Sequence, residues 1–67
     1  MTALVTYTDK GSGTTRGGAI RMAQRYATAK ALREGNSPEW CRLVSSSATQ
    51  IGAGLWWATV TISCSRP

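Results

Sequence analysis

The chain has 67 residues, enough for one small domain, and a domain of that size buries only about 60% of the surface of its unfolded chain. Its composition, 42% hydrophobic and 16% charged, excludes a disordered polyelectrolyte and is typical of a globular chain. The net charge of +5 favours anionic partners, although such a charge also keeps small domains in solution. We therefore expect one domain over residues 1–67, stabilised by a disulfide or by self-association.

The first residues, MTALVTYTDKGSG, have neither a basic region nor a long apolar core, so they do not resemble a signal peptide. No later segment is long and apolar enough to span a bilayer. These features predict a cytoplasmic protein without membrane contact.

Residues 3–8 (ALVTYT) are rich in β-branched and aromatic types and are expected to form the first strand. The turn formers DKGSGTT follow, and Thr14 or Thr15 is a suitable helix N-cap. Because flexible glycines beside a helix N-terminus can accept an anion, this predicted loop is a candidate anion site.

A helix is predicted from about Arg16 to Glu34, because apolar residues recur there at intervals of three and four. They are Ala19, Met22, Ala23, Tyr26 and Ala27. A face built mostly of alanine lets a helix backbone approach a sheet closely. Gly35 suits the position after the helix end, and Pro38 prevents an immediate restart.

Residues 39–50 and 54–65 read as a second and a third strand joined by a turn near Ile51–Ala53. The element order is β-α-β-β. It predicts an α+β fold in which one amphipathic helix packs on one face of a three-stranded antiparallel sheet.

In this predicted hairpin, the two residue numbers of each directly opposed pair add up to about 105. Cys41 then opposes Cys64, Leu43 opposes Ile62, and Ser45 opposes Val60. One face meets the helix and carries Cys41, Leu43, Trp56, Ala58, Val60, Ile62 and Cys64. The other face carries Trp40, Arg42, Val44, Leu55, Trp57, Thr59 and Thr61.

One helix covers only one face of such a sheet, so the second face is left with an apolar and aromatic patch. Either a partner subunit covers this patch, or the indoles of Trp40 and Trp57 stack on flat ligands. Both hold together if ligands bind between subunits.

The chain contains no histidine, and its acids fall in predicted loop or terminal positions, so acid–base catalysis and a metal site are not expected. In the cytoplasm, Cys41 and Cys64 are expected to be reduced and buried, although their direct opposition would also permit a disulfide. Arg21 and Arg25, one helical turn apart, could grip a phosphate or form an ordinary solvated face.

Three segments resemble the dodecins, small flavin-sequestering proteins: AIRMAQRYA on the helix, WCRLV at the second strand, and GLWWATVTI on the third. The resemblance implies a hollow dodecamer in which flavins stack on the tryptophan that opens the second strand, here Trp40. Thr59 stands where the family has a flavin-contacting glutamine.

The sequence thus predicts a non-enzymatic oligomer that sequesters a flat anionic ligand, such as a flavin or another nucleotide, at subunit interfaces. Its ring would stack on Trp40 and Trp57 beside Thr59, and its phosphate would meet the arginines at positions 42, 21 and 25. The alternatives are a small basic nucleic-acid-binding protein, phage-encoded for example, and a purely structural assembly subunit. Nucleic-acid binding would weaken strongly with added salt.

Overall fold

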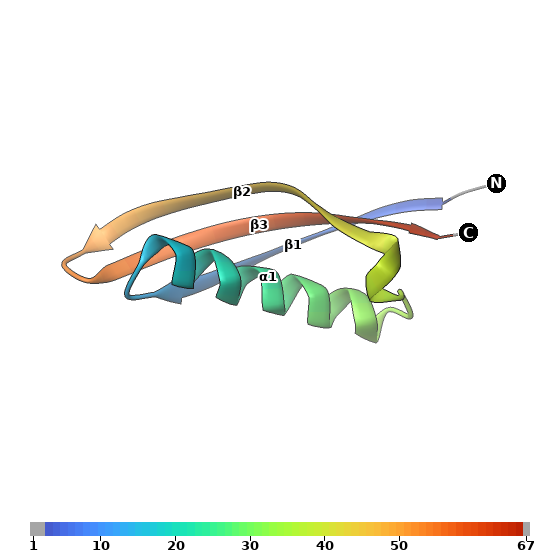
Figure 1. The fold of residues 1–67 in the computed structure, drawn as a ribbon, viewed down its shortest axis with the longest axis horizontal. Coiled ribbons are helices and arrows are strands. Elements are labelled where there is room, and N and C mark those ends of the chain that lie inside the picture. Colours follow the sequence, from blue (N-terminus) through green and yellow to red (C-terminus); the bar gives the residue numbers. More distant parts are fainter. Residues whose placement is uncertain (1–2, 67) are drawn as a thin grey trace.

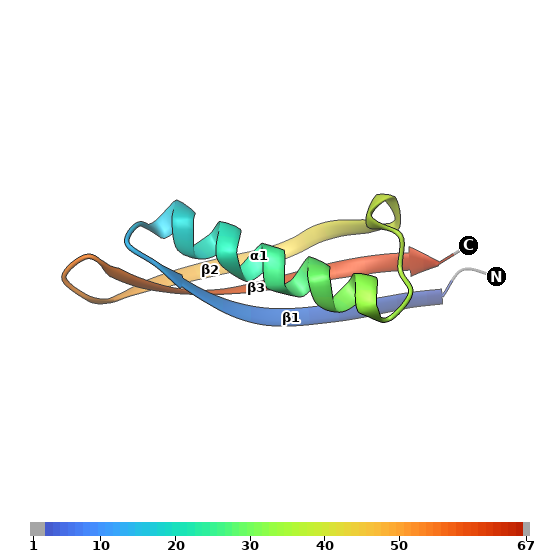
Figure 2. The same ribbon diagram turned by 90° about the horizontal axis from the view of Figure 1, so that it is seen from below.

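The computed structural model describes residues 3–66 and confirms the predicted α+β fold in the order β-α-β-β (Figure 1). The elements are β1 (Ala3–Gly13), α1 (Arg16–Arg33), the short 3-10 helix η1 (Pro38–Trp40), β2 (Cys41–Gly52) and β3 (Leu55–Arg66). The strands form one antiparallel sheet in the order β1-β3-β2, so β3 is central. The helix α1 lies along one face of this sheet (Figure 2).

The strand β1 is longer than predicted, because residues 9–13 continue it instead of forming a loop. Gly11 and Gly13 lie directly beneath α1. A Cβ atom at Gly11 would collide with the backbone nitrogen of Ala23, and one at Gly13 would lie 2.8 Å from the backbone nitrogen of Ala19. The glycines therefore allow the helix backbone to approach the strand, and the prediction of a flexible anion-binding loop is wrong.

The ends of α1 follow the sequence signals. Thr15 is the N-cap, and its Oγ1 accepts a hydrogen bond of 3.0 Å from the backbone N–H of Gly18. Gly35 adopts a left-handed conformation with φ of +88° just after the helix, as a C′ glycine commonly does. Between these ends, one alanine per turn is buried against the sheet: Ala19, Ala23, Ala27 and Ala31.

The hydrophobic core lies between α1 and the β1–β3 pair. Besides the four alanines it contains Tyr7, Ala58, Val60, Ile62 and Cys64. The predicted inward face of β3 is therefore confirmed, and Trp56 packs against this core while half-buried.

The hairpin register is confirmed at its first pairs, Cys41 with Cys64 and Leu43 with Ile62. It then shifts by one residue at Val44, so that Ser46 and not Ser45 faces Val60. The predicted pairing of Ser45 with Val60 is wrong. A bulge adds one residue, Val44, to β2 without a partner on β3, and such a bulge leaves the alternating pattern of β3 unchanged.

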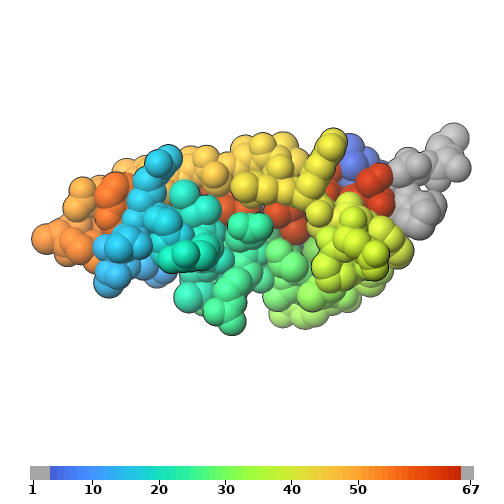
Figure 3. Space-filling view, in the orientation of Figure 1, coloured from blue at the N-terminus to red at the C-terminus, as the bar shows by residue number. Residues whose placement is uncertain are grey.

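Leu43 does not enter the core, and 45% of it is exposed. The helix covers β1 and β3 but leaves the inner face of β2 largely open. In Figure 3 red atoms of β3 are visible between the yellow atoms of β2 and the green atoms of α1. The expectation that Leu43 would be buried is therefore wrong.

Candidate functional site

A hollow of about 320 Å³ lies near the start of β2, on the sheet face that α1 leaves open. It is bounded by η1, by the start of β2 and by the facing ends of β1 and β3. Its lining residues are Leu4, Glu39, Trp40, Cys41, Arg42, Ser63 and Ser65. An indole, a guanidinium, a carboxylate and two hydroxyls thus meet in one place.

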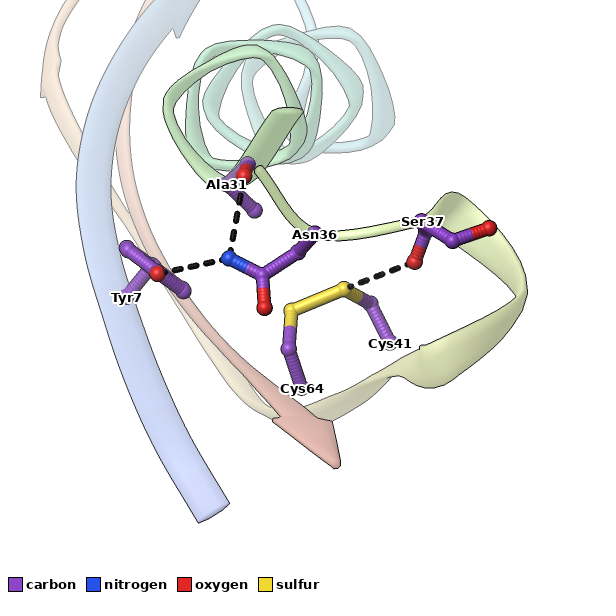
Figure 4. Close-up of a disulfide and its surroundings, with 6 residues drawn as sticks. All are labelled: Tyr7, Ala31, Asn36, Ser37, Cys41 and Cys64. Carbon is purple, nitrogen blue, oxygen red and sulfur yellow. Dashed lines mark hydrogen bonds between the residues drawn. A yellow bond between two sulfur atoms is a disulfide. The ribbon is translucent and has the colours of Figure 1, made fainter. Parts of the chain in front are cut away.

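The backbone around Trp40 is fixed by a disulfide between Cys41 and Cys64, whose sequence separation is 23 (Figure 4). The expectation that these thiols are reduced is wrong. The two cysteines oppose one another directly on β2 and β3, with their Cα atoms 3.9 Å apart. Because Cys41 stands between Trp40 and Arg42, the bond anchors both side chains of the hollow to the central strand.

Local contacts shape η1. The backbone N–H of Trp40 donates to the carbonyl oxygen of Ser37 at 3.0 Å, and the Ser37 hydroxyl donates to Oε1 of Glu39 at 3.0 Å. The Sγ atom of Cys41 lies 3.5 Å from the same carbonyl oxygen. Trp40 therefore ends a short 3-10 helix and does not lie within the second strand as the sequence predicted.

Behind η1, a buried amide joins the loop to the helix and to β1. Asn36 is only 3% exposed, and its Nδ2 donates to the hydroxyl of Tyr7 at 2.7 Å and to the carbonyl oxygen of Ala31 at 3.0 Å (Figure 4). Two donors of one amide thus hold the end of α1 against β1. The segment that leads into η1 starts from this fixed point.

Ser63 is the unusual residue of the hollow. It is 5% exposed, and its hydroxyl oxygen is buried without a hydrogen-bond partner in the part of the chain that the structure describes. A buried hydroxyl without a partner costs roughly 1–3 kcal/mol. Such groups are rare in folded proteins. The residue lines the hollow, but its hydroxyl oxygen is closed off from it.

The structure brings Trp40 and Arg42 together but not the other predicted site residues. Trp57 pairs with Ser12 and Thr49, and it is 43% exposed. It lies seven residues along β3 from Cys64, which is roughly 23 Å in an extended strand. The two tryptophans of one chain therefore do not share a ligand.

Thr59 lies on the same open face as Trp57, half-buried between Lys10 and Ser47 on the neighbouring strands. Arg21 and Arg25 line a different hollow, on α1.

Sequence reasoning did not select Glu39, Ser63 or Ser65. Successive residues of a strand point to opposite faces of the sheet, so Ser63, which precedes the core residue Cys64, points to the face of Arg42. This alternation could have identified Ser63 from the sequence. The burial of Ser63 could not be read from the pattern, because it depends on how the strands pack around it, with Thr6 of β1 and Arg42 of β2 as its neighbours.

No group of three or more potential metal-ligating side chains occurs within residues 3–66. Within that range, α1 is the longest helix, and neither it nor η1 has the length and apolarity of a membrane span. Comparisons of the chain with protein-family models, with curated proteins and with solved structures find no match.

Proposed function

We propose that this protein is a non-enzymatic binding protein that holds a flat anionic ligand, such as a flavin or another nucleotide, in the hollow beside Trp40. The ring stacks on the indole, and the anionic group pairs with the guanidinium of Arg42. The observation that carries the proposal is the position of an aromatic ring, Trp40, and a cation, Arg42, in the lining of one hollow.

We propose further that the chain self-associates through the sheet face that α1 does not cover. Several large apolar side chains are exposed there, namely Leu4, Leu55 and Trp57. Light scattering on the purified chain tests this part separately from ligand binding.

The cytoplasmic location predicted from the sequence also remains a proposal. The disulfide counts against it, because disulfides persist in oxidising compartments and on virion surfaces and are rare in the cytosol.

Isothermal titration with flavin mononucleotide and with adenosine monophosphate tests the binding site. Loss of the Trp40 indole in Trp40→Ala is expected to weaken binding about 10- to 100-fold, since stacking of one base on an aromatic ring contributes roughly 1–3 kcal/mol. Arg42→Gln is expected to weaken binding by a similar factor, because it removes a charge-assisted hydrogen bond.

Tyr26→Ala is the matched control, because it removes a half-exposed aromatic side chain that lines none of these hollows and lies on α1, away from the uncovered sheet face. It is expected to leave ligand affinity within about twofold. Equal losses in Tyr26→Ala and Trp40→Ala, or no binding of either probe, would contradict the proposed site. An oligomer that binds neither probe would favour the purely structural role.

A further inference from the structure

Most of the positive charge of the protein lies on one element. Five of the eight basic residues lie on α1, which contains no acid: Arg16, Arg21, Arg25, Lys30 and Arg33. The remaining three cations of the chain are balanced by its three acids. The net charge of +5 is therefore the charge of α1 alone, and all five side chains are exposed.

Two hollows connect this helix to the hollow beside Trp40. The first, of about 430 Å³, runs along α1 and is lined by Arg21, Gln24, Arg25, Thr28, Ala29 and Leu32. The second, of about 140 Å³, lies between α1 and β2 and is lined by Gln24, Thr28, Pro38, Cys41, Arg42, Leu43 and Ile62.

These hollows overlap in their lining residues. Gln24 and Thr28 belong to both hollows on the helix side, and Cys41 and Arg42 belong both to the middle hollow and to the one beside Trp40. The three hollows therefore adjoin one another around the edge strand β2, and we call them together the recess. The helix α1 leaves β2 partly uncovered here, and Leu43, which lines the middle hollow, is 45% exposed.

We infer that this recess binds single-stranded nucleic acid, with one base on Trp40 and the adjoining phosphates along Arg42, Arg25 and Arg21. The inference rests on the proposed function and specifies its ligand: the flat anion is one nucleotide of a longer strand. A recess with cations along its length and an aromatic ring at one end is the arrangement that single-strand binding uses elsewhere.

Two other polyanionic surfaces fit less well. A base inside a duplex is stacked and paired, so it could enter the hollow only after extrusion, at a cost in free energy. An anionic bilayer would need an apolar helix face to insert, but the apolar face of α1 is buried against the sheet.

Anisotropy or calorimetry at several salt concentrations tests the inference. The probes are thymidine monophosphate and oligothymidylates up to about eight nucleotides long. Affinity is expected to rise with length. For three phosphate contacts, the slope of log affinity against log salt is expected to be about −2. The double variant Arg21→Gln, Arg25→Gln is expected to reduce this slope to about −0.7 and to leave mononucleotide affinity unchanged.

The matched control is Lys30→Gln, Arg33→Gln, which removes the same charge from the same helix at residues that line none of the three hollows. It is expected to leave the slope close to that of the unmodified chain. An equal loss of slope in the two double variants would overturn the inference. The charge of α1 would then contribute to binding regardless of whether it lies along the recess.

The outcomes separate this inference from the proposed function. Mononucleotide binding that depends on Trp40, with no gain from longer strands, overturns the inference and leaves the proposed function in place. Tighter binding of a duplex than of the single strand also overturns the inference. Failure of both the thymidine mononucleotide and the oligomers to bind overturns the inference, whereas the proposed function fails only if flavin mononucleotide and adenosine monophosphate also do not bind.

Discussion

The two ends of this elongated molecule hold the helix on the sheet by different means. At the end beside η1, a disulfide and the buried amide of Asn36 tie the backbone together. At the other end, the backbone of α1 rests directly on Gly11 and Gly13 of β1. Beyond that contact, the β2–β3 turn projects past the helix (Figure 1).

The difference explains why two tryptophans that seem equivalent in the sequence lie in different environments. Trp40 stands beside Cys41, where a covalent bond and several hydrogen bonds fix the chain around a hollow. Trp57 lies on the open sheet face toward the projecting hairpin. A binding site needs side chains in fixed positions, and only the first end provides them.

The largest effect is expected from Gly11→Ala, at the end held by close packing. Its new Cβ meets the backbone of Ala23, which cannot move aside as a flexible side chain could. We expect a loss of about 3 kcal/mol or more in the free energy of unfolding, at the upper limit of overpacking effects. Urea unfolding followed by circular dichroism measures it.

Gly17→Ala is the control for this substitution, because nothing lies within 4 Å of a Cβ at that position and the residue is helical. It is expected to stabilise the protein by about 0.4–1 kcal/mol. If Gly11→Ala were as mild as Gly17→Ala, the close contact between helix and strand would not exist in solution.

Reduction of the Cys41–Cys64 disulfide tests the opposite end. With a sequence separation of 23, loss of the bond is expected to lower the free energy of unfolding by about 3 kcal/mol. Ligand affinity should fall as well, because η1 is then anchored less firmly. Mass spectrometry and urea unfolding with and without a dithiol measure both states, and an unchanged mass after treatment would mean that no disulfide had formed.

A smaller effect at the same end is expected from Tyr7→Phe. It removes the hydroxyl that accepts from Asn36 Nδ2 at 2.7 Å and leaves that N–H without this partner. We expect a loss of about 1–2 kcal/mol in the free energy of unfolding. Tyr26→Phe is the matched control, since Tyr26 is half exposed, and it should change stability by less than about 0.5 kcal/mol.

Local patterns determined much of the fold. The spacing of alanines defined the buried face of α1, Thr15 and Gly35 marked its ends, and strand alternation selected the inward residues of β3. These features are readable because each depends on residues close together in the chain. The pairing of Cys41 with Cys64 also followed from the position of one turn.

Contacts between distant segments decided the rest. In the sequence, the glycines at positions 11 and 13 are typical of a loop, and only the position of α1 shows that they allow close packing of helix and strand. The bulge at Val44 depends on how β2 pairs with β3. The hollow beside Trp40 needs η1, β2 and two strand ends at once, and only their packing removes the hydroxyl of Ser63 from water. The sequence by itself named Trp40, Arg42, Arg21 and Arg25 as candidates. The tertiary structure placed Trp40 and Arg42 in one hollow and Arg21 and Arg25 in another, and it left Trp57 outside both, because proximity depends on how the strands and the helix pack and not on residue type.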